Sequence, residues 1–308
     1  MNDDTEIPDN ALDHPVGPPP PVTNIKVMVR SAYDLQKLRV QMGNRIVANF
    51  KAKLGQPPSV SEEDSLDDDG KQVLDDLRTE YKKITDGVKT FPRQANFKGT
   101  EIISTYTELC LIAQYMTMEQ QEDTAFRRLG SILREYPIFT EFLDKVKGIG
   151  PAMAGVIISE FNIHRAKYPS SMWAYAGLDV AADGRGRSRK AEHLVVRQYT
   201  DREGKPAERN GITFNPFLKT KLIGVLATSF LRVGDNPYRD IYLGYKNRLE
   251  NHPKWGTAEV SKGHRHNASM RYMIKRFLVD LYKVWRAIEG LAVAPEYSEG
   301  KLGIRHSA

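Results

Sequence analysis

Apolar side chains recur at three- and four-residue steps through most of residues 25–136, which is the spacing of helices that bury one face. Three such segments follow one another, from Ile25 to Leu54, from Leu74 to Val88 and from about Thr100 to Tyr136. Short segments separate them, so the pattern predicts antiparallel helices that pack together. We therefore expect a helical bundle or coiled coil over residues 25–136.

The segments outside these three helices are acidic or rich in proline. Residues 1–24 combine both features, including Pro18-Pro19-Pro20-Pro21, and are predicted to form a disordered arm. Residues 59–70 are predicted to form an acidic linker between the first two helices.

Helix caps divide residues 137–308 into shorter elements. Asn215-Pro216 and Asn236-Pro237 each place an N-cap side chain before a proline at the first helical position. Asn267 is expected to cap the last long helix. Helices are predicted over residues 139–146, 152–161, 216–231, 237–251 and 268–290.

The remaining residues of this half predict one small sheet. Residues 193–200 and 206–214 alternate enough to form a β-hairpin, whereas the stretch from Pro169 to Asp183 is predicted as a loop. The predicted fold class is therefore mainly α, with an N-terminal helical part, a second helical domain and one small β-hairpin.

Charge is distributed unevenly along the chain. Its 308 residues carry 45 Lys and Arg against 39 Asp and Glu, a net charge of +6. Residues 1–180 hold 21 basic and 26 acidic side chains, a net of −5, whereas residues 181–308 hold 24 and 13, a net of +11. A local excess of this size favours a polyanionic partner, and a solubilising surface is the alternative.

Composition excludes several classes of protein. With 40% hydrophobic and 27% charged residues, the chain is neither collagenous nor fully disordered. No stretch approaches the roughly 20 apolar residues of a membrane helix, and residues 1–13 lack a signal-peptide pattern. The single Cys110 excludes an internal disulfide framework and a cysteine zinc site. We therefore expect a cytoplasmic protein without a membrane partner.

The sharpest local pattern is Lys147-Gly148-Ile149-Gly150-Pro151, between two predicted helices. The glycines let the backbone turn tightly and approach a ligand, Ile149 fills the space between the helices, and Pro151 sets the second helix. The free N–H groups of its first turn then form an anion site. This pattern resembles the helix-hairpin-helix motif, so Lys147, Gly148, Ile149 and Gly150 are predicted to contact the DNA backbone. A plain helical turn with glycine caps is the alternative.

A wider order of motifs resembles a known family. The hairpin is followed by Tyr175-Ala176-Gly177-Leu178, then by a Gly/Ser/basic stretch, then by a helix that ends in Ser229-Phe230-Leu231-Arg232. Over roughly residues 139–232 this order resembles the C-terminal domain of insertion-sequence transposases of the 110/116/902 group. The resemblance implies a DNA-binding protein of a mobile element that acts in transposition and recombination. It also implies a helix-hairpin-helix domain over residues 137–308, with a C-terminal helical extension.

The family's chemistry assigns a candidate catalytic residue. Its C-terminal serine is a nucleophile, and four acidic residues of an N-terminal sheet domain bind Mg²⁺. Ser188 is the nearest match to that serine, although arginine follows it where the family has glycine. Residues 25–136 show no alternating strands with an early aspartate, so the acidic residues have no counterpart there. The resemblance thus implies Ser188 as the nucleophile and Mg²⁺ as the cofactor of a catalytic reaction, and it leaves the activity open.

The neighbours of Ser188 allow two interpretations. Arg185, Arg187, Arg189 and Lys190 are predicted DNA contacts, and they would hold a scissile phosphate beside a nucleophilic serine. Alternatively, Ser188 contacts the DNA backbone from a flexible basic loop and performs no chemistry.

Other residues change this interpretation little. His264-Arg265-His266, with His252 and His193, offers imidazoles but no carboxylate at a short spacing, so no metal site is predicted.

The long helices favour a homo-oligomer. A structural protein that oligomerises through them, and uses the basic half for solubility, is the alternative from another class. DNA is the expected partner, and the sequence leaves open whether RNA is preferred or a guide RNA takes part.

Overall fold

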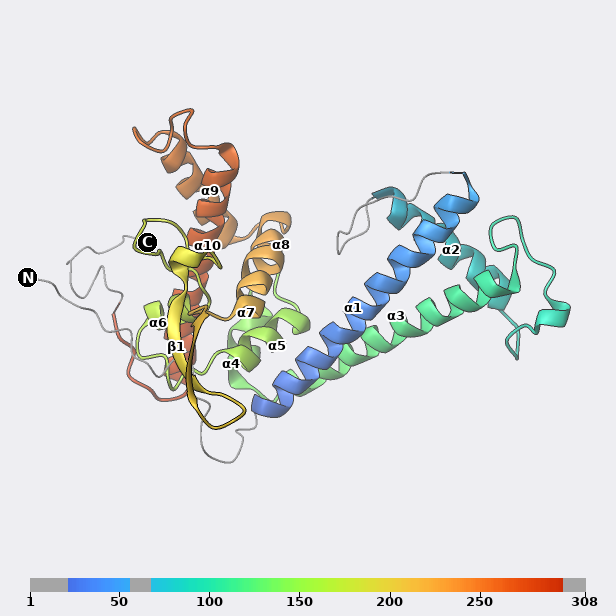
Figure 1. Ribbon diagram of the computed structural model, residues 1–308, viewed down its shortest axis with the longest axis horizontal. Helices are drawn as coiled ribbons and strands as arrows, with labels where there is room; N and C mark the ends of the chain where they lie inside the picture. Colours follow the sequence, from blue (N-terminus) through green and yellow to red (C-terminus); the bar gives the residue numbers. More distant parts are fainter. Residues whose placement is uncertain (1–21, 56–67, 296–308) are drawn as a thin grey trace, which may run out of the picture. The chain divides into compact units, whose positions relative to one another are not determined.

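The computed structural model describes residues 22–55 and 68–295, and it confirms the mainly α-helical fold (Figure 1). Within these residues the only sheet is antiparallel and two-stranded, formed by β1 (Val195–Thr200) and β2 (Pro206–Gly211). Its register pairs Val195 with Gly211 and Thr200 with Pro206. The predicted β-hairpin is therefore present, with its turn over residues 201–205.

The chain divides into two compact units. Unit 2 is Val27–Leu129, and unit 1 contains the described residues up to Lys26 and from Gly130 onward. Residues 1–21 of the predicted arm and 59–67 of the predicted linker lie outside the described residues. The last residues of both segments are helical, because the first helix begins at Val22 and the second at Asp68.

Unit 2 is built from antiparallel helices, as the sequence predicts. α1 and α3 run in opposite directions, since Arg39 pairs with Glu122 while Lys53, farther along α1, pairs with Glu108 near the start of α3 (3.3 Å). α2 packs against α3 through Arg78, whose Nη2 lies 2.6 Å from an oxygen of Glu119. The bounds are α1 (Val22–Lys53), α2 (Asp68–Thr85), a 3₁₀ turn (Gln94–Asn96) and α3 (Tyr106–Leu133).

The apolar stripes of these helices form the core of unit 2. The buried Tyr115 of α3 also links its two neighbours, because its hydroxyl accepts hydrogen bonds from Arg39 of α1 (3.3 Å) and Arg78 of α2 (2.8 Å). The buried side chains of this core are Ile46, Val47, Phe50, Leu74, Leu77, Ile103, Leu109, Ile112 and Tyr115.

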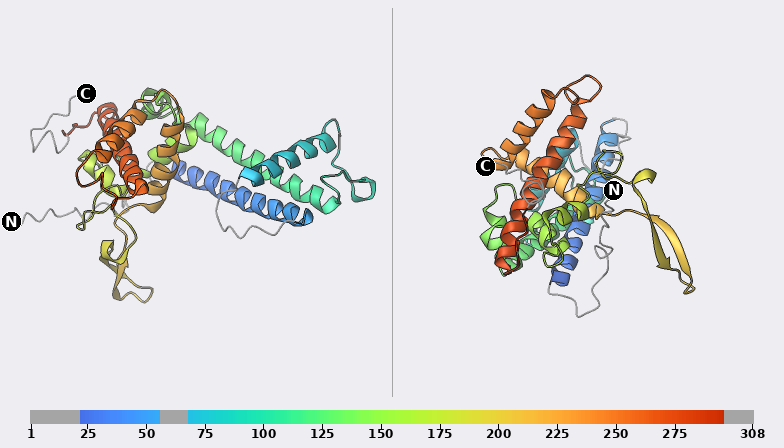
Figure 2. Two further views of the ribbon diagram at one scale, coloured as in Figure 1. Left: turned by 90° about the horizontal axis from the view of Figure 1, so that it is seen from above. Right: turned by 90° about the vertical axis from the view of Figure 1, so that its left-hand side faces the viewer.

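Unit 1 is organised around the long helix α10 (Lys262–Ile288), with α9 (Pro237–Glu250) beside it (Figures 1 and 2). The Phe277 ring of α10 lies at the centre of an aromatic cluster, with ring centroids 5.5 Å from Tyr238, 5.6 Å from Phe230 and 6.2 Å from Phe142. The other helical elements are α4 (Pro137–Glu141), a 3₁₀ turn (Leu143–Lys145), α5 (Pro151–Glu160), α6 (Pro169–Tyr175), a 3₁₀ turn (Ala191–His193), α7 (Pro216–Thr220), a π-helical stretch (Lys221–Leu226) and α8 (Ala227–Arg232).

Three local predictions for unit 1 are wrong. Pro169–Tyr175 is a helix rather than a loop, and seven residues are too few to show a helical period in the sequence. The helix predicted over residues 139–146 is interrupted at Phe142, where φ is −132° and ψ is −62°. α10 starts at Lys262, because the Ser261 side chain accepts from the His264 N–H (3.1 Å), so Asn267 is not its cap.

Candidate nucleic-acid interface

The glycine hairpin joins the 3₁₀ turn that ends at Lys145 to the start of α5. Gly148 has φ = +96°, a left-handed conformation that glycine adopts without strain. Ile149 is buried, whereas Gly150 is the exposed N-cap of α5 and Pro151 occupies the first helical position. The turn at Gly148, the burial of Ile149 and the helix start at Pro151 are therefore as expected, and the contacts with DNA stay a prediction.

The hairpin is held from one side by the end of α8 and the loop after it. The Gly148 carbonyl accepts from the Ser229 hydroxyl (2.8 Å), and the Lys147 carbonyl accepts from the Asn236 amide (2.9 Å). A Cβ at Gly148 would lie 3.1 Å from the Phe230 ring, a tight contact that adds to the backbone strain of any other residue there. The Lys147 side chain remains exposed.

The opposite side of the hairpin is open. No side chain caps the N-terminus of α5, and a Cβ built at Gly150 would meet no atom within 4 Å. The positive end of the α5 dipole thus lies beside an exposed lysine, Lys147, whose ion pair with Asp235 (3.3 Å) is formed by two exposed side chains. Such a pair contributes little and is readily replaced by a phosphate.

The Tyr-Ala-Gly-Leu element connects α6 to the basic loop. Gly177 has φ = +65°, and a Cβ there would lie 2.6 Å from the ring of Phe214, so no other residue fits without displacing that ring. Ala176 and Leu178 are buried on either side of it. This element fixes the point at which the chain leaves the core and enters the loop that carries Ser188.

The basic loop, residues 179–193, is folded on itself. Val180 and Gly186 form an isolated antiparallel bridge, which closes a turn around Gly184. The Arg187 side chain is largely buried and donates from both Nε (3.0 Å) and Nη2 (2.7 Å) to Asp179 Oδ2. Arg185, Arg189 and Lys190 are exposed. Among the four predicted basic contacts, therefore, Arg187 anchors the loop and the other three face solvent.

Ser188 belongs to a hydrogen-bonded chain of three side chains. Its Oγ lies 2.8 Å from Nδ1 of His193, and Nε2 of the same ring lies 3.2 Å from Oδ2 of Asp183. The imidazole is buried, with 2% of its side chain exposed. The N–H of Arg185 donates to Oδ1 of Asp183, and this bond, with the His193 contact, holds the pKa of that carboxyl below its ordinary value despite an opposing effect of desolvation.

The hydrogen bonds define the tautomer of the neutral ring. The Ser188 backbone N–H donates to His193 Nδ1 (3.0 Å), so Nδ1 carries the lone pair and Nε2 carries the proton that points to Asp183. Nδ1 can then accept the proton of the Ser188 hydroxyl, while Asp183 stabilises the resulting imidazolium. This is the arrangement of a serine nucleophile, a base and an orienting carboxylate, with the two ring nitrogens in exchanged roles.

The same residues do not fit a metal ion. Asp183, Glu192 and His193 have ligand atoms within 4.8 Å of one another. Mg²⁺ prefers oxygen ligands, however, and both oxygens of Asp183 are already hydrogen-bonded. A metal on Nε2 would need that nitrogen deprotonated, while the Ser188 N–H requires the lone pair of Nδ1. Asp183, Glu192 and His193 therefore do not form a Mg²⁺ site in this arrangement.

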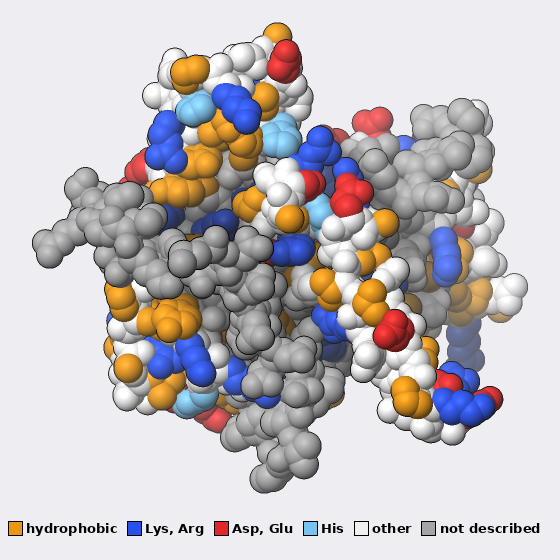
Figure 3. All heavy atoms as spheres, turned by 60° about the vertical axis from the view of Figure 1, so that its left-hand side comes forward, with side chains coloured by type: hydrophobic (Ala, Val, Ile, Leu, Met, Phe, Trp, Pro, Cys, Tyr) orange, Lys and Arg blue, Asp and Glu red, His pale blue; other side chains and the backbone are white. Residues whose placement is uncertain are grey.

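The hairpin and the basic loop are separate features of unit 1. The hairpin is bonded to the end of α8 and to Asn236, whereas the loop contacts α7 through Lys219, which donates to the Arg187 carbonyl. On the face drawn in Figure 3, basic side chains of the described residues form several groups among apolar and acidic ones. The hairpin and the basic loop are thus held by different partners within unit 1.

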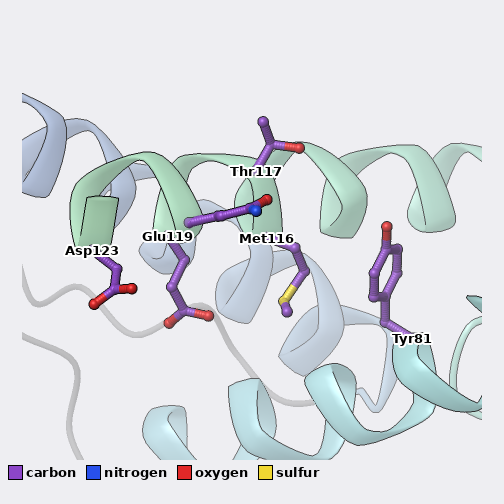
Figure 4. Close-up of a pocket in the computed structure, with 6 residues that line it drawn as sticks. Tyr81, Met116, Thr117, Glu119 and Asp123 are labelled. Carbon is purple, nitrogen blue, oxygen red and sulfur yellow. The ribbon is translucent and has the colours of Figure 1, made fainter. Parts of the chain in front are cut away.

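A groove in unit 2 has a different character. It has a volume of about 430 Å³ and is lined by Tyr81 of α2 and by Met116, Thr117, Glu119, Gln120 and Asp123 of α3. Figure 4 shows the side chains of Met116, Glu119 and Asp123 on one side of α3 and Thr117 on the other. Both of its carboxylates are ion-paired, Glu119 with Arg78 (2.6 Å) and Asp123 with Arg127 (3.0 Å), so the groove offers no free basic group to a nucleic-acid backbone.

Sequence reasoning missed two members of the Ser188 chain. From the sequence, His193 is expected to begin a strand and Asp183 to end a loop, and neither is predicted to contact Ser188. The three residues are spaced at five-residue intervals, which do not place all of them on one face of a helix or of a strand, so only the folded loop brings these groups together.

Comparisons with known proteins identify neither a family nor a function for this chain. No model of a protein family matches the sequence, and no curated protein matches it significantly. No helix within the described residues is long and apolar enough to cross a membrane.

Proposed function

We propose that unit 1 binds the sugar–phosphate backbone of DNA and serves in transposition or recombination of a mobile element. The open glycine hairpin carries this proposal. A left-handed glycine, a buried apolar residue, an exposed N-cap glycine and an N1 proline together present the uncapped end of α5.

The physical argument is electrostatic. Uncapped N–H groups and the helix dipole favour an anion, and Lys147 adds a full positive charge beside them. Exposed Arg185, Arg189 and Lys190 supply further contacts without reading sequence. The net charge of +11 over residues 181–308 would steer a polyanion toward unit 1. The order of motifs that resembles the insertion-sequence transposases supports DNA as the nucleic acid.

The test is binding of duplex DNA at increasing salt, with a variant that spares the fold. Gly150→Ala places a methyl group where a phosphate would approach, yet that Cβ has no protein neighbour. We expect a loss of no more than about 1 kcal/mol in stability, because alanine is a poorer N-cap than glycine, together with about tenfold weaker binding and a steep salt dependence in both proteins. Gly244→Ala, on α9 and equally free of neighbours, is the matched control and should bind like the wild type.

Two outcomes would overturn this proposal. Salt-insensitive binding, or none at low salt, contradicts a backbone interface. Equal affinity of Gly150→Ala and Gly244→Ala excludes the hairpin as the contact.

A second candidate function is strand cleavage by Ser188, which the 2.8 Å contact with His193 Nδ1 favours. The Ser188 Oγ would attack phosphorus and give its proton to Nδ1. The new O–P bond forms as the bond from phosphorus to the departing nucleoside oxygen breaks, and the imidazolium returns its proton to that oxygen. The test is a covalent protein–DNA adduct on a denaturing gel. Ser188→Ala should abolish the adduct, and an adduct that persists would exclude this serine.

A further inference from the structure

Four basic side chains of unit 1 gather beneath the basic loop. Lys219 comes from α7, Arg271 and Lys275 lie one turn apart on α10, and Arg187 comes from the loop itself. We term them the cation cluster. All four residues are partly buried, unlike the exposed Arg185, Arg189 and Lys190 above them.

Direct contacts place the members of the cation cluster. The Lys219 ammonium donates a hydrogen bond to the Arg187 carbonyl. The Arg271 guanidinium lies against the backbone of Gly186, where a Cβ would collide with it. The Lys275 ammonium lies 5.2 Å from the centroid of the Trp173 ring. The cluster therefore joins α6, α7 and α10 to the loop of Ser188.

The charges of the cation cluster are not balanced. Asp179 is the carboxylate that interacts with Arg187, Lys219 and Lys275, and its Oδ2 is taken by Arg187. Among the described residues, neither Arg271 nor Lys275 has a hydrogen bond or an ion pair. Two like charges at i and i+4 on a helix also repel each other.

Partial burial makes the positive charges of the cation cluster still less favourable in free energy. Desolvation lowers the pKa of Lys219 below its ordinary value, and the positive charges of Arg271 and Arg187 lower it further. Desolvation likewise lowers the pKa of Lys275 and of Arg271. Desolvated cations that lack partners are unfavourable in a folded protein, and a bound anion removes the penalty.

We propose that the cation cluster binds a phosphate group, with Lys219, Arg271 and Lys275 as its donors. Arg271 interacts electrostatically with both Lys219 and Lys275, and neighbouring cations of this kind suit a tetrahedral oxyanion. The Arg271 guanidinium lies beside Gly186, two residues before Ser188. The phosphate comes from a nucleic-acid backbone or from free phosphate, and both offer the same oxygens. The choice of DNA as the source rests on the proposed function, whereas the phosphate chemistry does not.

The experiment measures the melting temperature of the full chain in sodium phosphate and in sodium chloride at equal ionic strength. With phosphate at about a hundred times its Kd, we expect the wild type to melt about 5–10 °C higher. Arg271→Met and Lys275→Met should lose this response and melt no lower than the wild type in chloride, because each removes repulsion. Lys275→Arg keeps the charge and should keep the response. Lys262→Met removes an exposed lysine of the same helix and is the matched control.

Tryptophan fluorescence is a second measurement, and it locates the bound phosphate. Trp173 lies beneath Lys275, so phosphate should change its fluorescence, and Trp173→Phe should remove that change. An equal melting shift in the wild type and both methionine variants would indicate general ion exclusion and overturn the site. Absence of any shift in the wild type, or lower melting of both variants in chloride, would overturn it as well.

Competition between phosphate and an oligonucleotide without a terminal phosphate distinguishes the two sources of the phosphate group. Competition with phosphate in the wild type, and loss of that competition in Arg271→Met, would assign the cation cluster to the nucleic-acid backbone. Phosphate binding without competition would keep the site and assign it to free phosphate. DNA binding that depends on Gly150 but not on Arg271 or Lys275, without a phosphate response, would overturn the site and leave the proposed function standing.

Discussion

The imidazole Nδ1 of His193 lies 2.8 Å from the Oγ of Ser188 and 3.0 Å from the backbone nitrogen of the same residue. Two donors of Ser188 thus share one lone pair. The backbone bond orients the ring whether or not the hydroxyl reacts, and Asp183 orients it from the other nitrogen. A substitution that keeps the hydrogen bond from the Ser188 N–H can therefore remove the proton transfer without unfolding the loop.

The first prediction concerns His193→Asn. The asparagine Oδ1 takes the position of the imidazole Nδ1 and accepts from the Ser188 N–H, but the amide is not a base and does not reach Asp183. If Ser188 forms a covalent DNA adduct, we expect this variant to remain folded and to form the adduct about 10²–10⁴ times more slowly. Adduct formation at the full rate would exclude His193 as the base.

The second prediction concerns acid. The pKa of Asp183 is lowered, chiefly by the Arg185 N–H and further by His193, so its ionised form is favoured by folding. Its contribution is present above the ordinary value of about 3.9 and is lost as pH falls through the lower folded pKa. NMR signals of loop residues should therefore change below about pH 4. Asp183→Asn should remove this step, and a step that persists in the variant would assign it to another group.

The third prediction concerns the glycine after α6. Gly177→Ala puts a Cβ at φ = +65° and 2.6 Å from the Phe214 ring, so we expect a loss of about 2 kcal/mol or more in the free energy of unfolding. Gly204→Ala, at φ = +81° in the β-hairpin turn with no neighbour within 4 Å, carries only the backbone cost of about 1 kcal/mol. Denaturant unfolding of the two variants checks this order, and equal losses would contradict the packing argument.

The fourth prediction concerns the start of α3. The Glu108 carboxylate accepts from the Thr105 N–H (3.1 Å), while the Thr105 hydroxyl accepts from the Glu108 N–H (3.2 Å), a reciprocal capping box. Lys53 of α1 binds the same carboxylate (3.3 Å). Glu108→Ala should therefore destabilise the protein by about 1–2 kcal/mol in denaturant unfolding. The exposed Glu101→Ala is the control, and a loss in both variants of the same size would contradict a specific cap.

Much of the hairpin was predictable because its geometry is local. Gly148 adopts a left-handed backbone conformation and Pro151 begins a helix. Glycine and proline favour these conformations in any protein, so both could be predicted from the sequence. The loop of Ser188 was not predictable. Its contacts depend on a bridge between Val180 and Gly186 and on a buried imidazole, and neither follows from periodicity or from turn propensity.

The sequence by itself determined the mainly α-helical fold, the β-hairpin, the proline-initiated helices and the glycine turn, because each depends on residues within a few positions of one another. Only the tertiary structure decided that Asp183, Ser188 and His193 form one chain, and that Lys219 and Arg271 approach the same loop from different helices. The first relationship depends on how one loop folds around the Val180–Gly186 bridge, which no periodic pattern specifies. The second arises from packing between elements far apart in the chain, where burial and charge depend on neighbours that local patterns do not specify.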